Sequence, residues 1–124
     1  MSGLFDSSVF KVTQAALDAS ALRHQVISNN MANNDTPGFK RSDVNFDDVL
    51  QQAVSSSDSG SDFTLGENAS PFVYQSKDTS MRLDGNNVDM DAESAKMAEN
   101  TLYYDGLTRL ISSKFSMLNA AIKG

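Results

Sequence analysis

The sequence predicts a mainly α-helical protein. Long N- and C-terminal helices are expected to pair as a coiled coil, with a small irregular or β-containing middle segment between them. Two observations favour this fold class: apolar residues recur every seven positions near both ends of the 124-residue chain, and a Thr-Pro-Gly break and an acidic, serine-rich stretch separate the two patterns. The length suits one modest domain.

The first helix is predicted over residues 8–33. Its apolar stripe occupies the a and d positions of a heptad, and its members are Phe5, Val12, Ala15, Ala19, Leu22 and Val26. Neither proline nor glycine occurs between Leu4 and Thr36. The helix is expected to end in the Asn-rich stretch, because the residue before Pro37 is pushed out of the helical region and Gly38 permits a turn.

The region after this break is ambiguous. Val44 and Phe46 could alternate in a short strand, whereas Phe46, Val49 and Leu50 could equally begin a helical turn. Both alternatives stay open. The next stretch, Ser55 to Asp62, has nothing to bury and is predicted to be a mobile linker.

A small hairpin is predicted farther along the middle segment. Weak strand signals occur at residues 72–74 and 81–83, and Asp84-Gly85 is a strong turn signal. This hairpin would be the last part of an acidic, partly disordered middle segment, residues 43–88. We divide the chain into residues 1–42, 43–88 and 89–124, which we expect to form one domain.

The second helix is predicted over residues 90–122. Met90, Met97, Tyr104, Ile111 and Leu118 are spaced by seven without exception, and Leu107 and Ala121 take d positions of the same heptad. Further apolar residues widen the stripe on both flanks: Tyr103, Leu110 and Met117 on one, and Phe115 and Ile122 on the other. Two helices alone cannot cover stripes of this width, so copies of the same chain are the simplest partner.

Charge and composition exclude several classes of function. The net charge is -6 and no basic stripe is present, which disfavours nucleic acid as a partner. The absence of cysteine excludes disulfides and zinc–thiolate sites. No apolar run reaches the roughly 20 residues of a membrane span, and the N-terminus lacks the features of a cleavable secretory signal.

The sequence offers no positive support for an enzyme or a cofactor. It contains no Gly-rich phosphate loop and no nucleophile motif. A calcium loop starting at Asp84 fails, because Val88 and Asp89 occupy the positions that need an oxygen ligand and a glycine. The single histidine, His24, has no partner spaced to make it catalytic. We therefore expect no metal and no cofactor.

Three strings resemble a known family. Residues 29–40, NNMANNDTPGFK, are similar to the signature near the N-terminus of bacterial flagellar axial proteins, which include the rod and hook subunits. Residues 84–91, DGNNVDMD, look like the motif that rod proteins carry before their C-terminal helix. Residues 110–118, LISSKFSML, resemble the proximal rod subunit of the basal body more than its relatives. Residues 51–70 match nothing in the family.

The resemblance implies a structural subunit of the proximal rod that polymerises with itself and with other rod proteins, and transmits torque around the export channel. It implies contact with the rod-base and export-gate adaptor, export by the flagellar type III apparatus without a cleaved signal, and a periplasmic location in the basal body. It also implies helices that are largely disordered until assembly. The alternatives are another flagellar axial paralogue, or a small acidic module that binds a cation or a protein.

The candidate site residues fall into three groups. The Asn-rich segment is interpreted as an assembly joint, because an uncharged amide both donates and accepts hydrogen bonds; its residues are Asn29, Asn30, Asn33, Thr36, Pro37, Gly38 and Phe39. Packing between subunits is assigned to Val12, Ala19, Leu22, Val26, Met97, Tyr104, Leu107, Ile111, Phe115 and Leu118. Phe46 and Leu50 fit an aromatic-x-x-x-aliphatic pattern that resembles the segment recognised by the export gate.

Overall fold

The computed structural model describes residues 7–61, 63–65, 69–79 and 82–123. Phe5 and Met81, which the sequence places in the first stripe and in the hairpin, lie outside these ranges. The elements along the chain are α1 (Ser7–Ala32), β1 (Ser42–Val44), α2 (Phe46–Asp58), the single 3-10 turn η1 (Ser70–Phe72), β2 (Val73–Gln75) and α3 (Met90–Lys123).

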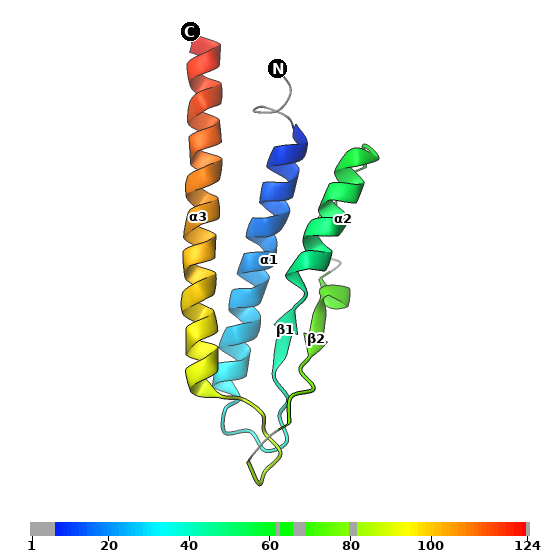
Figure 1. Ribbon diagram of the computed structural model, residues 1–124, viewed down its shortest axis with the longest axis vertical. Coiled ribbons are helices and arrows are strands. Elements are labelled where there is room, and N and C mark those ends of the chain that lie inside the picture. The colour runs from blue at the N-terminus through cyan, green and yellow to red at the C-terminus, as the bar shows by residue number, and fades with distance from the viewer. Residues whose placement is uncertain (1–6, 62, 66–68, 80–81, 124) are drawn as a thin grey trace.

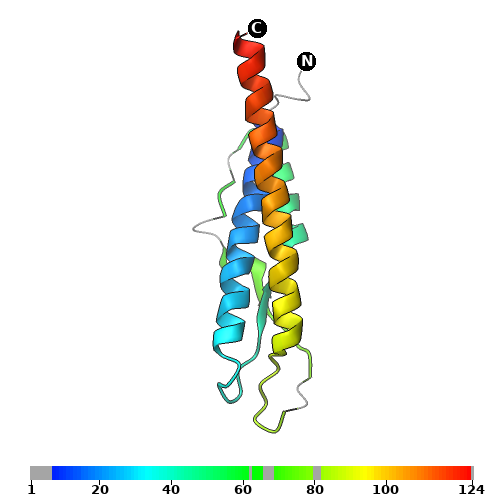
Figure 2. The ribbon, with the colours of Figure 1, turned by 90° about the vertical axis from the view of Figure 1, so that its left-hand side faces the viewer.

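The molecule is elongated, and its three helices lie roughly along one direction (Figure 1). α1 and α3 pack side by side and run antiparallel, and α2 lies against the other side of α1 (Figures 1 and 2). The two strands extend below α2 as a small antiparallel sheet. The predicted fold class, with long terminal helices and a small β-containing middle, is confirmed.

The terminal helices begin and end close to their predicted positions. α1 has 26 residues and ends at Ala32, within the Asn-rich stretch, and α3 has 34 residues. The side chain of Asp89 accepts hydrogen bonds from the amides of Asp91 at 3.0 Å and Ala92 at 3.3 Å, so it caps the start of α3. None of the helices in the described ranges combines the length and apolarity needed to cross a membrane.

Both readings of the ambiguous region are realised, one after the other. Val44 closes the strand β1, and Phe46 opens the helix α2. Asn45 separates them: its side-chain oxygen accepts from the amide of Asp48 at 3.4 Å, and its own amide donates to the carbonyl of Phe72 at 2.7 Å. Asn45 therefore makes the last backbone hydrogen bond beside the β1–β2 pair and also caps the start of α2.

The linker prediction was wrong for its first four residues, because α2 continues to Asp58. The serines have weak helix propensity. Burial of Val49 and Ala53 against α1 outweighs that preference, since most helical stability in proteins comes from packing of an apolar face.

The hairpin prediction was also wrong. β2 pairs with β1, not with residues 82–83, and the register places Ser42 opposite Gln75 and Val44 opposite Val73. The turn itself is confirmed, because Gly85 has a φ of +79°. The Asp84-Gly85 signal thus identified a reversal of the chain but not the partner of β2. That partner, β1, lies about thirty residues before β2 in the sequence.

The hydrophobic core lies between α1, α2 and the segment that follows α2. Its buried members are Ala15, Ala19, Val49, Ala53 and Leu65, and Val12, Leu22, Phe46, Phe63, Ala69 and Phe72 pack around them. Alanines on both helices let the two backbones approach closely. The side of α1 that faces α2 is therefore covered within the chain.

Replacing Ile27 with alanine should lower the free energy of unfolding by about 2–5 kcal/mol, because its side chain is fully buried and a cavity would remain. Ile122→Ala is the matched control: this isoleucine is 75% exposed, and its loss should change stability by less than about 0.5 kcal/mol. Urea unfolding followed by circular dichroism measures both. Equal effects would contradict the described burial.

Candidate functional site

The joint between the helices is built around a buried asparagine. Asn30, in the last part of α1, is fully buried. Its amide nitrogen donates to the carbonyl of Ser42 at 2.8 Å, and its amide oxygen accepts from the backbone N–H of Ser42 at 3.0 Å. The side chain thus pairs with β1 as a neighbouring strand would, and it fixes the strand to the helix.

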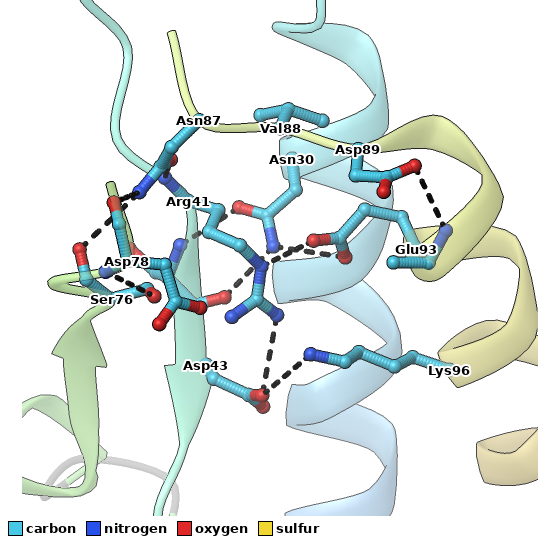
Figure 3. Close-up of polar contacts among 12 residues, drawn as sticks. Asn30, Arg41, Asp43, Ser76, Asp78, Asn87, Val88, Asp89, Glu93 and Lys96 are labelled. Atoms are coloured by element: carbon cyan, nitrogen blue, oxygen red, sulfur yellow. Dashed lines mark hydrogen bonds and ion pairs between the residues drawn. The ribbon is translucent and has the colours of Figure 1, made fainter. Parts of the chain in front are cut away.

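A buried ion-pair network continues from this contact (Figure 3). Asn30 also donates to Oε2 of Glu93 at 3.3 Å, and Arg41 Nε donates to Oε1 of the same carboxylate. Arg41 Nη2 reaches Asp43 Oδ2 at 3.3 Å, and Arg23 Nε donates to Asp43 Oδ1 at 3.1 Å. The network therefore joins α1, β1 and the first turns of α3.

Electrostatics favour the charged forms of two network members. Burial alone would lower the pKa of Arg41, but the hydrogen bonds and charges of Glu93 and Asp43 outweigh burial and raise it. Burial alone would raise the pKa of Asp43, but the amide of Val44 and the guanidinium groups of Arg23 and Arg41 lower it below its usual value. Among the described residues, every fully buried side-chain nitrogen or oxygen has a hydrogen-bond partner.

Asn86 closes the C-terminal end of α1. Its amide nitrogen donates to three carbonyls that follow the helix: those of Asn33 at 2.9 Å, Asn34 at 3.1 Å and Thr36 at 2.8 Å. Its amide oxygen accepts from the N–H of Val88 at 2.7 Å. The carbonyls of the turn after α1 are therefore satisfied by a residue about fifty positions downstream.

Asn87 performs a similar role on the strand side. Its side-chain oxygen accepts from the amide of Arg41 at 2.7 Å, and its side-chain nitrogen donates to the carbonyl of Asp78 at 3.1 Å. Its own amide donates to the carbonyl of Phe39 at 3.3 Å. The pair Asn86-Asn87 thus holds the turn after α1 against the approach to α3.

A second polar contact lies farther along the α1–α3 seam. Ser20 Oγ donates to Asn100 Oδ1 at 3.0 Å, and Asn100 Nδ2 donates to the carbonyl of Ser20 at 2.9 Å. Both side chains are buried. Together with the Asn30–Glu93 contact, this pair fixes the two helices to each other at two levels.

The predicted joint residues divide into a buried and an exposed set. Asn30 enters the network, and Gly38 makes the turn with a φ of +73°, its amide donating to the carbonyl of Asp84 at 2.8 Å. Asn33 and Phe39 are half-buried. Asn29, Thr36 and Pro37 are exposed, although Asn33 and Asn29 bond each other side chain to side chain at 3.2 Å.

Sequence reasoning missed the charged members of the network. Glu93 lies in the first turn of α3, where an acidic residue complements the helix dipole, and its side chain is fully buried against Arg41. One signal could have revealed it: Glu93, Asn100 and Leu107 are spaced by seven, on the side of α3 that faces α1. A polar residue on an apolar stripe predicts a buried polar contact.

The residues assigned to packing between subunits also divide. Ala19 is buried in the core, Val12 and Leu22 pack around it, and Val26 is half-buried. On α3, Met97, Leu107, Ile111 and Leu118 are half-buried, and Tyr104 and Phe115 are exposed. Phe115 keeps 52% of its surface exposed although its ring stacks on Phe10 at 5.3 Å.

α3 presents more apolar surface than these residues alone. Its other exposed large apolar side chains are Met90, Leu102, Tyr103, Leu110, Met117 and Ile122. They lie on both flanks of the seam that α3 shares with α1. Eight of the eleven large apolar side chains that are exposed in the described part of the chain therefore lie on α3.

Phe46 and Leu50 lie beside this surface. The ring of Phe46 meets Tyr103 of α3 edge to face, with centroids 5.0 Å apart. Both residues are half-buried and line a cavity of about 510 Å³ between α2, the strands and α3. The described ranges hold no group of three or more acidic or histidine side chains that could bind a metal ion.

Comparison with known proteins gives a consistent result. Residues 10–40 match the protein family described as flagella basal body rod protein. The chain is 32% identical to flagellar basal body rod protein FlgB of Bacillus subtilis, over 95% of both chains. It is 35% identical to FlgB of Aeromonas hydrophila, over 97% of this chain and 96% of the relative. It is 34% identical to FlgB of Salmonella typhimurium, over 90% of this chain and 91% of the relative.

Glu93→Leu should destabilise the fold by about 3–5 kcal/mol, because Arg41 would keep a buried charge without this partner. Adding Arg41→Met should recover most of the loss, since an apolar pair replaces the ion pair. The control is Glu99→Leu, at an exposed position of the same helix, which should change stability by less than about 0.5 kcal/mol. Chemical denaturation measures all three. A double variant as unstable as Glu93→Leu would contradict the network's role.

Stability should also fall in acid through Asp43. Because its pKa is lower in the folded chain than in the unfolded one, Asp43 stabilises the fold above its ordinary pKa of about 3.9. This contribution is lost as the pH falls through the lowered value. Asp43→Asn should be less stable at pH 7, with a flatter dependence below pH 5. Asp47→Asn, at an exposed position, should keep the original slope in the same unfolding measurements.

Proposed function

The chain belongs to the family of flagellar basal body rod proteins FlgB, and on this premise we propose that it assembles through the exposed flanks of α3. It is a structural subunit of the proximal rod, it lies in the flagellar basal body, and it assembles with other rod proteins. The near full-length match disfavours a small regulatory module. Torque passes through the rod by way of these packed helices.

The exposure of α3 is the observation that carries this proposal. From Thr101 to Lys123 only Leu107, Ile111, Lys114 and Leu118 are half-buried, and all other residues are exposed. Large contiguous apolar surfaces on soluble chains mark sites of protein association. Copies of the chain and related rod subunits would cover both flanks, in line with the packing role expected for Met97, Tyr104, Leu107, Ile111, Phe115 and Leu118.

The joint would contribute to assembly through its exposed members. Asn29, Thr36 and Pro37 lie at the surface beside the capped end of α1. They carry hydrogen-bonding groups and no charge, so copies would not repel one another there. Asn30 and Gly38 would act indirectly, because they hold the shape of the turn that presents these residues.

Export without a cleaved signal, through the flagellar type III apparatus and into the periplasmic rod, is also part of the proposal. The partners would be the export gate and the adaptor at the rod base. Phe46 and Leu50 are half-buried in the folded chain, so recognition of this pair would require the chain to be unfolded. Helices that need neighbouring subunits to cover their apolar faces are suited to a chain that is exported unfolded and folds when it assembles.

Leu110→Lys combined with Met117→Lys should abolish rods, because each buried lysine would weaken association by more than about 1.4 kcal/mol, or tenfold. The control carries Ser112→Lys and Ser116→Lys, which add the same charges at exposed positions on the side of α3 that faces away from α1. Electron microscopy of basal bodies and swimming in soft agar provide the readouts, in cells whose own copy is deleted. Circular dichroism should show equal helicity for both. Normal rods in the first variant would refute the proposal.

A further inference from the structure

We propose that the C-terminal half of α3 from a second copy docks into the groove between α2 and α3. This inference rests on the proposed function and specifies which surfaces meet. The first wall of the groove comes from α2, where Phe46, Leu50 and Val54 are spaced by four and share one side of the helix. Val54 is 45% exposed.

The second wall comes from α3. Tyr103, Leu110 and Met117 are spaced by seven and share one flank of that helix, and each is between 45% and 46% exposed. The edge-to-face contact between Phe46 and Tyr103 joins the walls at the base. The cavity of about 510 Å³ beside that contact shows that the base is open enough to receive side chains.

The complementary ridge lies on the other flank of α3. It consists of Tyr104, Phe115 and Ile122, which are 42%, 52% and 75% exposed. The seam with α1 separates this ridge from the groove wall, so the two surfaces point to different sides of the same helix. A ridge on one copy and a groove on the next make a head-to-tail contact, which builds rings or open helical arrays and not two-fold dimers.

Charge identifies the occupant as this chain. α2 carries Asp47, Asp48 and Asp58 and no basic residue. Residues 106–123 carry Arg109, Lys114 and Lys123 and no acidic residue. The acidic wall of one copy therefore attracts the basic end of α3 from another, and repels a second α2.

The end of α3 is also free to reach a neighbour. α3 extends past the start of the described α1 and rises above α2 at the same end of the molecule (Figures 1 and 2). Ile122 lies in this overhang and is the most exposed residue of the ridge. Among the described residues, a neighbour can therefore receive it without displacing any contact that the structure shows for Ile122.

Cysteine cross-linking tests the contact, since the natural chain has no cysteine. A variant with both Val54→Cys and Ile122→Cys should form a ladder of disulfide-linked multimers in oxidised basal bodies. Each single variant should stay monomeric, because a head-to-tail contact never brings equal positions together. Ser28→Cys with Ile122→Cys is the control and should form no ladder. Dimers of Ile122→Cys alone, or rods without a ladder, would overturn the inference and leave the proposed function standing.

Charge exchange tests the same contact with purified, concentrated chain. Two variants are prepared. The first carries Val54→Cys together with Asp47→Lys and Asp58→Lys. The second carries Ile122→Cys together with Lys114→Glu and Lys123→Glu. Either reversal alone should reduce the cross-linked fraction about tenfold, and the two reversed copies mixed should restore it. Circular dichroism checks that α2 persists. No reduction, or no restoration with helices intact, would refute the pairing of α2 with α3.

Discussion

The buried carboxylate of Glu93 is the constraint around which the fold is arranged. A charge taken out of water must find an opposite charge and further hydrogen bonds, and here they come from different elements. Arg41 stands before β1, Asn30 belongs to α1, and Glu93 lies on α3. Sliding α3 by one turn, about 5.4 Å, would break the contacts of Glu93 with both Arg41 and Asn30 and leave its carboxylate without them. The network therefore contributes less to net stability than to a single register of helix against helix and helix against strand.

The regular elements could be predicted from sequence because their signals are local. A seven-residue repeat and the Thr36-Pro37-Gly38 break determine where α1 and α3 begin and end, and both helices lie within two residues of expectation. The partner of β2 and the groups that pair with the buried Glu93 could not be predicted in this way. Each depends on which distant segment comes into contact, and a short strand or a lone acid carries no mark of its partner.

The assigned site residues show the same division. The Asn-rich string predicts an assembly joint, and this stays a prediction. Within the chain Asn30 links α1 to β1 and α3, but a pattern that lists amides cannot say which of them is buried. Val12, Ala19 and Leu22 fit an apolar stripe, and the stripe faces α2 within the chain. On α3 the stripe is wider than its seam with α1, and we propose that the excess packs against other subunits.

The end of α1 is completed by residues that come much later in the chain. Asn86 lies fifty positions beyond Thr36, Glu93 sixty-three beyond Asn30, and Asn100 eighty beyond Ser20. A polypeptide released from the ribosome N-terminus first thus lacks the groups that satisfy its opening helix until most of it has been synthesised. The polar contacts that α1 and the turn after it make with later residues are therefore complete only once α3 has been synthesised.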